Sequence, residues 1–170
     1  MTTPEFSRPE RLDTIGPGER SVAFAADPDE CAALAGRFGL IAVAALNAAL
    51  SVRREAAGIR VRGRVSATVA QACSVTGEPL PVRVDAPLDV LFVAEEQAPS
   101  DEVELDEASC DIVFHDGQTV DLGEAAAETL ALALDPFPRG PGADAALKAA
   151  GVLGEGEAGP FGALAALLRK

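Results

Sequence analysis

The chain has 170 residues, is 48% hydrophobic and carries a formal charge of −13. This length suits one domain with a packed core. Trp and Tyr are absent, which removes the side chains most often used to stack on single-stranded nucleic acid. Because an acidic surface repels phosphate, tight RNA binding over the whole surface is disfavoured. The charge is typical either of a protein with a basic partner or of one that is merely kept soluble.

The cysteines and the apolar segments together predict a cytoplasmic protein. Cys31, Cys73 and Cys110 are scattered and odd in number, which argues against a disulfide framework and fits a reducing compartment. Met1–Glu10 lacks the apolar run of a signal peptide. The longest apolar stretch, Gly39–Leu50, is too short and too rich in alanine to span a bilayer.

The first part of the chain predicts a strand and a capped helix. Arg20–Ala25 alternates as a short strand. A helix is expected to follow Asp27, with Pro28 at its first position and Glu30 completing a capping box. Gly39 is expected to end it.

The middle of the chain predicts a long β-hairpin. Leu40–Arg54 is ambiguous because its alanines favour a helix, but its position between a glycine and a clear strand favours a strand. Residues 59–70 and 81–93 each alternate strictly between apolar and polar side chains, as half-buried strands do. The short turn Ser74–Pro79 joins them into an antiparallel hairpin. Pro87 predicts an edge position or a bulge.

The second half of the chain is strongly acidic. Asp85–Asp135 contains fifteen Asp and Glu residues and no Lys or Arg. Its densest part, Glu95–Glu107, is predicted to be a mobile loop, and Ile112–Phe114 a short strand. A second helix is expected to begin at Asp121, where Glu124 completes a D-x-x-E capping box.

Composition changes again after Pro136, which ends the second helix. Residues 139–159 predict a flexible Gly/Ala-rich linker, although Asp144–Ala150 could equally form two helical turns. Residues 160–170 predict a short apolar helical tail that docks on its own domain, docks on a partner or stays disordered. The expected fold is therefore α+β: one domain over residues 1–138, with an antiparallel sheet of roughly four to six strands and two capped helices, plus a short C-terminal helix.

No group of residues predicts catalysis, a metal site or a cofactor. The single histidine, His115, sits in a predicted turn, and no Cys or His pair has metal-ligand spacing. Cys73 lacks a nearby cation that would activate its thiol, which favours a structural role. Glu124 and Glu128 share a helix face and are typical of a solvated face. Asp101–Asp111 is the only dense source of carboxylates for Mg²⁺.

One basic feature stands out against the acidic background. Arg60, Arg62 and Arg64 alternate along the predicted hairpin on the side opposite the core. They could contact RNA phosphates or the acidic loop of the same chain. The second possibility is favoured slightly because it needs no partner.

Three segments, in the same order along the chain, resemble one family. They are G-I-R-V-R-G-R-V-S-A-T-V-A-Q-A-C-S-V-T-G-E-P-L-P-V at Gly58–Val82, T-V-D-L-G-E-A-A-A-E-T-L-A-L-A-L-D-P-F-P-R at Thr119–Arg139, and G-P-F-G-A-L-A-A-L-L-R-K at Gly159–Lys170. Together they resemble the YceD-type proteins, the large ribosomal RNA subunit accumulation proteins. Many members carry C-x-x-C-G in the hairpin turn, whereas here Thr76 stands where the second cysteine would be. A paired-thiol function is therefore not expected in this turn.

The resemblance implies a structural role for eight motif positions. These are Cys73, Gly77, Pro79, Asp121, Leu122, Glu124, Glu128 and Pro136. Candidate contacts with a partner or RNA are Arg60, Arg62, Arg64, Phe161, Leu164 and Leu168.

The resemblance also implies a non-catalytic factor that supports synthesis, processing or stability of large-subunit ribosomal RNA. Its expected partner is a basic ribosomal protein or a large-subunit assembly intermediate, or else precursor ribosomal RNA; no membrane is involved. Two alternatives remain open: an RNA-processing enzyme using acidic residues with Mg²⁺, and an acidic chaperone-like interaction protein without a ribosomal link.

Overall fold

The computed structural model describes residues 4–94, 111–115 and 117–152. Its chain falls into two compact units. The first combines Met1–Ala70 with Pro81–Leu134, and the second combines Gln71–Leu80 with Asp135–Lys170. The hairpin turn therefore groups with the chain that follows the second long helix, and each unit is described by itself.

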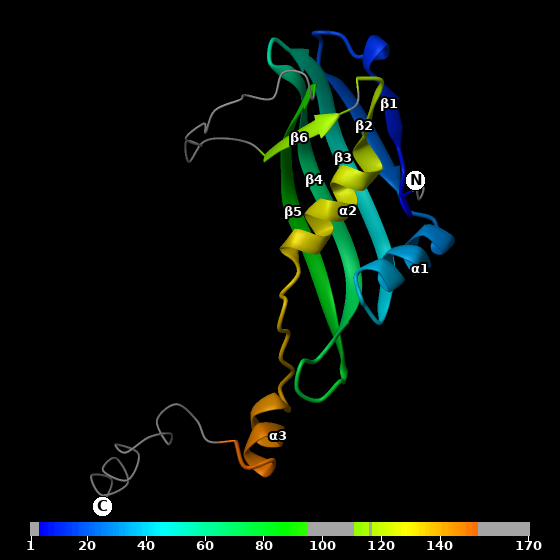
Figure 1. The fold of residues 1–170 in the computed structure, drawn as a ribbon. Helices are drawn as coiled ribbons and strands as arrows, with labels where there is room; N and C mark the ends of the chain where they lie inside the picture. Colours follow the sequence, from blue (N-terminus) through cyan, green and yellow to red (C-terminus); the bar gives the residue numbers. More distant parts are fainter. Residues whose placement is uncertain (1–3, 95–110, 116, 153–170) are drawn as a thin grey trace, which may run out of the picture. The chain divides into compact units, whose positions relative to one another are not determined.

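In the described residues, five strands form one sheet in the order β2-β3-β4-β5-β6 (Figure 1). The strands are β2 (Arg20–Ala25), β3 (Ala42–Glu55), β4 (Gly58–Ala72), β5 (Pro79–Ala94) and β6 (Asp111–His115). β2 and β4 both pair antiparallel with β3, and β4 neighbours β5 as the predicted hairpin. The ambiguous segment Leu40–Arg54 is thus a strand, β3, because pairing with strands on both sides outweighs the helix propensity of its alanines.

The last strand departs from the predicted antiparallel sheet. β6 pairs with β5 in parallel, over Val90–Ala94. A parallel pair needs a long connection, and residues 95–110, which join β5 to β6, supply one. Pro87 precedes the stretch of β5 that pairs with β6, so it occupies the kind of edge position that the sequence predicted.

One face of the sheet and two helices build the core. Side chains alternate along β4 between buried and exposed, and Val61 and Val65 are fully buried. The helices α1 (Pro28–Arg37) and α2 (Leu122–Ala133) add their apolar sides to the same core cluster. Figure 1 shows α2 lying diagonally across the sheet. Leu34 of α1 and Leu122 of α2 are both fully buried.

The N-terminal segment forms a small sheet with a distant part of the chain. Its strand β1 (Pro9–Arg11) pairs antiparallel with β7 (Thr119–Asp121), and a short 3-10 helix, Leu12–Thr14, follows β1. Phe6, just before β1, is fully buried in the main core. The local sequence pattern did not predict this two-stranded sheet, because its strands are more than a hundred residues apart in the chain.

The capping boxes predicted for the two helices have different outcomes. Asp27 accepts from the backbone N–H of Asp29 and Glu30, and Glu30 reaches back to the N–H of Asp27, so the box on α1 is complete. Asp121 caps α2 as predicted. The reciprocal half of that box was predicted wrongly, because the Glu124 carboxylate accepts from Arg37 of α1.

The second unit contains the hairpin turn and the helix α3 (Ala143–Ala149). Between the linker and the two helical turns that the sequence left open for this region, the structure shows the helix. The Nε2 of Gln71 donates to the carbonyl of Asp135 at 2.9 Å, which joins the two segments of this unit. The predicted tail over residues 160–170 lies outside the described residues.

Candidate functional site

The arginine row, defined as Arg60, Arg62 and Arg64, lies on the solvent side of β4. All three side chains form ion pairs with carboxylates on β5. Arg60 and Arg62 share Asp89, at 2.6 and 3.2 Å, and Arg64 pairs with Asp85 at 2.8 Å. Three guanidinium groups thus face two carboxylates, which leaves one net positive charge on an otherwise acidic protein.

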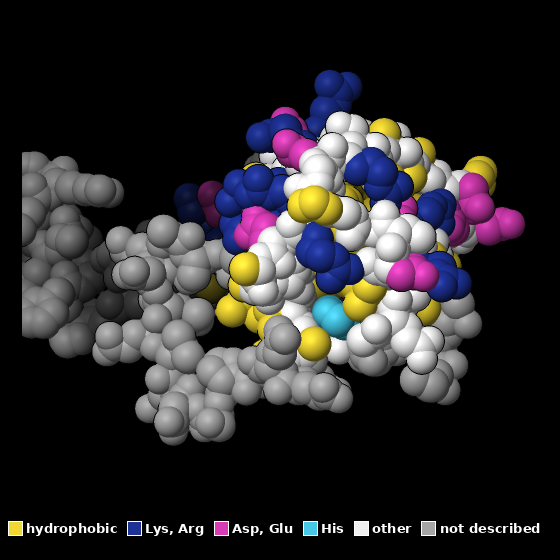
Figure 2. Space-filling view, turned by 90° about the horizontal axis from the view of Figure 1, so that it is seen from above, with side chains coloured by type: hydrophobic (Ala, Val, Ile, Leu, Met, Phe, Trp, Pro, Cys, Tyr) yellow, Lys and Arg dark blue, Asp and Glu magenta, His cyan; other side chains and the backbone are white. Residues whose placement is uncertain are grey.

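The ion pairs shift the pKa values of the paired side chains. The hydrogen bond that Arg64 donates to Asp85 lowers the pKa of Asp85 and raises the pKa of Arg64. Burial works against the ionised form of Asp89, but the bonds from Arg60 and Arg62 outweigh it and lower its pKa. Figure 2 shows Lys and Arg side chains interleaved with Asp and Glu on the face seen from above. Within the described residues, the carboxylates that pair with the row come from β5. The acidic loop considered from sequence, Glu95–Glu107, lies outside these residues, so contact with it stays a prediction.

The hairpin turn places backbone N–H groups around the sulfur of Cys73. Sγ accepts from the N–H of Thr76 at 3.5 Å and from that of Gly140 at 3.3 Å. Gly77 adopts a φ of +73° and donates its N–H to the carbonyl of Cys73, while Pro79 begins β5. The N–H of Gly140, followed by the bonds from Thr76, lowers the pKa of the Cys73 thiol to about 6.

The sequence offered no sign of this thiol environment, because the strongest donor lies 67 residues away in the chain. Cys73 itself is buried, with 3% of its surface exposed. Hydrogen bonds from Gly140 and Thr76, rather than a side-chain cation, favour the thiolate, so the absence of a neighbouring Lys or Arg in the sequence did not indicate it.

Asp121 is the junction between α2 and the N-terminal segment. Its Oδ1 accepts from the backbone N–H of Gly123, Glu124 and Arg8, and its Oδ2 accepts from the hydroxyl of Ser7. Leu122 follows it into the core. The motif position that the resemblance marked as structural thus caps a helix and also fixes a distant part of the chain.

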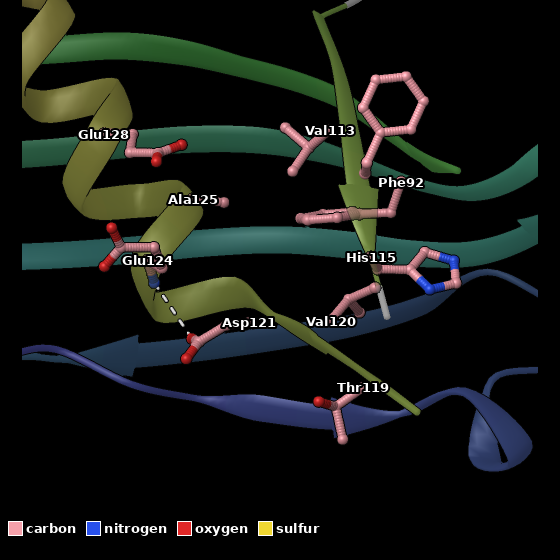
Figure 3. Close-up of a pocket in the computed structure, with 10 residues that line it drawn as sticks. Phe92, Val113, His115, Thr119, Val120, Asp121, Glu124, Ala125 and Glu128 are labelled. Carbon is pink, nitrogen blue, oxygen red and sulfur yellow. Dashed lines mark hydrogen bonds between the residues drawn. The ribbon is translucent and has the colours of Figure 1, made fainter. Parts of the chain in front are cut away.

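Beside this junction, α2 and β6 border a cavity of about 320 Å³, named here the α2–β6 cleft (Figure 3). It is lined by Phe92, Val113, Phe114, His115, Thr119, Val120, Asp121, Glu124, Ala125 and Glu128. Figure 3 shows Phe92 and Val113 pointing toward α2. Five of the lining residues are apolar, and the polar ones are His115, Thr119 and the three carboxylates Asp121, Glu124 and Glu128.

The two glutamates of the cleft differ in their partners. Glu124 is engaged by Arg37, with Nη1–Oε2 at 2.9 Å and Nη2–Oε1 at 2.5 Å. Glu128 forms no ion pair with any described residue. Burial, followed by the charge of Glu124, raises the pKa of Glu128. The shared helix face was predicted correctly, but the neighbouring apolar cavity depends on β6 and could not be read from the helix alone.

Some of the predicted positions lie outside these sites or outside the described residues. Pro136 follows the end of α2. Phe161, Leu164 and Leu168 lie outside the described residues, as does most of Asp101–Asp111. Among residues 4–94, 111–115 and 117–152, no three His, Cys, Asp or Glu side chains converge to hold a metal ion. In the same residues, no helix has the length and apolar character needed to cross a membrane.

Comparison with known proteins identifies the family. No curated protein and no solved structure matches the chain. A family model described as large ribosomal RNA subunit accumulation protein YceD matches residues 61–168. The match includes most of the arginine row, the Cys73 turn and all of α2, and it spans well over half of the chain. The chain therefore belongs to the YceD family of large ribosomal RNA subunit accumulation proteins.

Proposed function

We propose that the protein promotes the accumulation of large-subunit ribosomal RNA by binding a basic protein partner, without itself catalysing a reaction. The family match over residues 61–168 carries the proposal. The formal charge of −13 supports a basic partner, such as a ribosomal protein or a large-subunit assembly intermediate. In this proposal the protein acts in the cytoplasm, where it meets these partners.

The ion pairs of the arginine row favour a protein partner over RNA. A phosphate that approached Arg62 or Arg64 would compete with Asp89 or Asp85, whose oxygens already accept from these side chains. The same two carboxylates would repel the phosphate. The arginine row is therefore assigned to holding β4 and β5 together, and direct RNA contact becomes an outcome of the test.

The cellular experiment is depletion of the protein followed by measurement of both ribosomal RNAs. A selective loss of large-subunit RNA, restored by the wild-type chain, is the expected result. Affinity purification from the same cells, with protein and RNA both identified, should recover a basic large-subunit protein. Unchanged subunit profiles after depletion would contradict the proposed function.

Two sets of variants separate protein binding from RNA binding. The combined change Arg60→Gln, Arg62→Gln and Arg64→Gln removes the row, and Asp85→Asn with Asp89→Asn releases it from its internal partners. If the row serves RNA, the first set abolishes binding of precursor RNA and the second strengthens it. We expect neither set to change rescue once thermal unfolding shows that the variants are folded.

A further inference from the structure

We propose that the α2–β6 cleft is the docking site for a basic, amphipathic segment of the partner protein, with an apolar side chain in the cavity and a Lys or Arg beside Glu128. The inference rests on the proposed function for the class of partner, and it adds the place where that partner binds.

The interior of the cleft suits an apolar side chain. Phe92 and Val120 are 5% and 2% exposed, so this part of the lining belongs to the packed core rather than to a hydrated surface. The volume of about 320 Å³ is at the small end of the range for ligand sites. It can therefore accept side chains of a docked segment rather than a large cofactor.

Exposed apolar side chains also lie on the edge strand that borders the cavity. β6 is the terminal strand of the five-stranded sheet, and Ile112 and Phe114 on it are 45% and 49% exposed. Because side chains alternate along β6, these two lie on the opposite face of the strand from Val113, so a ligand that contacts both faces must reach around the sheet edge and be longer than a small molecule. This extent favours a polypeptide as the occupant.

The carboxylates at the border of the cleft favour a polypeptide with positive charge. The oxygens of Asp121 accept from Ser7, Arg8 and the first turn of α2, and those of Glu124 accept from Arg37. Glu128 is thus the border carboxylate without an ion pair to a described residue. A cation beside Glu128 would offset the burial that disfavours its ionised carboxylate, whereas a phosphate would be repelled by it.

The same argument disfavours the segment of the chain that connects β5 to β6. Residues 95–110, which connect β5 to β6, contain seven Asp and Glu residues and no Lys or Arg. Their charge has the same sign as that of Glu128. A partner with Lys or Arg next to apolar residues is complementary in both respects.

The proposal can be tested with the full chain and synthetic peptides of alternating Leu and Lys, Leu and Glu, or Ser and Lys. Fluorescence anisotropy should show binding of the Leu–Lys peptide only. Phe114→Ser should weaken it about tenfold by removing an apolar contact, and Glu128→Gln about threefold to fivefold by removing one ion pair. Leu132→Ser, an 82% exposed residue of α2 outside the cleft, and Glu19→Gln, an exposed carboxylate elsewhere, are the matched controls and should have no effect.

Nuclear magnetic resonance supplies a second measurement that does not depend on affinity. Addition of the Leu–Lys peptide should shift the methyl signals of Val113 and Ala125 and lower the pKa of Glu128. Equal binding of the Ser–Lys peptide would show general charge attraction and overturn the proposal, as would unchanged binding by the Phe114 and Glu128 variants. Self-association that Phe114→Ser abolishes would assign the cleft to a second copy instead. Because these assays use purified protein, their failure is distinguishable from a failure of depletion to lower ribosomal RNA.

Discussion

Arg37 at the end of α1 and Glu124 in the first turn of α2 form a two-bonded ion pair, with Nη1–Oε2 at 2.9 Å and Nη2–Oε1 at 2.5 Å. The hydrogen bonding of Arg37 to the accepting carboxylate of Glu124 is the main cause of the raised pKa of Arg37. The side chains are 31% and 25% exposed, and they connect two helices that cover the same core. The pair is also placed to complement the positive N-terminal end of α2 and the negative C-terminal end of α1.

We expect Glu124→Gln to lower the free energy of unfolding by about 0.5–1 kcal/mol, because it removes a well-formed but partly hydrated ion pair. Urea denaturation of the purified chain would measure this change. Asp13→Asn is the control, since the ion pair between Arg11 and Asp13 is 73% and 62% exposed and should contribute nothing measurable. Equal effects at both sites would mean that the helix–helix pair adds nothing specific.

Two helical glycines should respond to alanine with opposite signs. In α2, a Cβ at Gly123 would lie 2.5 Å from the backbone oxygen of Phe6, so the N-terminal segment must move. In α1, a Cβ at Gly36 meets nothing within 4 Å. Gly36→Ala should stabilise the chain by up to about 1 kcal/mol through helix propensity. Gly123→Ala should destabilise it by about 1–3 kcal/mol despite the same gain.

Thermal and urea unfolding of the two alanine variants would give the sign directly. If Gly123→Ala were as stabilising as Gly36→Ala, the packing of Phe6 against the start of α2 would not contribute to the native state. The comparison is clean because both changes add one methyl group to a helix.

Alternation and capping carried most of the fold prediction. The strict alternation around Arg60–Arg64 identified β4 and its solvent face, and Asp27 and Asp121 marked the starts of both long helices. These features depend on neighbours within a few residues. The β1–β7 pair and the parallel contact of β6 depend on segments distant in the chain, so no local pattern could show them.

The candidate site was predictable only in part for the same reason. The sequence indicated that Glu124 and Glu128 share a face, but it could not show that Arg37 neutralises one of them. The aromatic side chain of Phe92 and the exposed one of Phe114 come from different strands. The cleft that they border with α2 exists only after the sheet has formed.

Asp121 should matter for stability more than an ordinary helix cap. Asp121→Ala removes the acceptor for the first turn of α2 and the acceptor for Ser7 and Arg8 at once. We expect a loss of at least about 1–2 kcal/mol, the upper range for caps. Asp121→Asn, which retains one oxygen for capping, should lose less. Equal losses from both variants in urea denaturation would indicate that capping is not the main contribution.

The apolar tail should contribute to partner binding. Deletion of residues 159–170 removes Phe161, Leu164 and Leu168, which share one side of the predicted tail helix. We expect the midpoint of thermal unfolding to stay unchanged and capture of the basic partner to weaken. A fall of several degrees in that midpoint would instead show that the tail docks within its own chain. Replacing the three apolar residues with Ser in the full-length chain is the matched control for the deletion.

The last prediction concerns the protonation of Cys73, whose pKa the N–H groups of Gly140 and Thr76 lower to about 6. The ultraviolet thiolate absorbance that Cys73→Ser removes should therefore appear with a midpoint near this pKa. In the unfolded chain the thiol titrates near its ordinary, higher pKa. Ionisation of Cys73 therefore stabilises the folded state increasingly as pH rises from the folded pKa to the unfolded pKa. This contribution is lost as pH falls through the folded pKa. Burial raises the pKa of Cys31, so Cys31→Ser should leave the low-pH step intact. A Cys73 midpoint at the ordinary thiol pKa would show that the two amides do not hold a thiolate in solution.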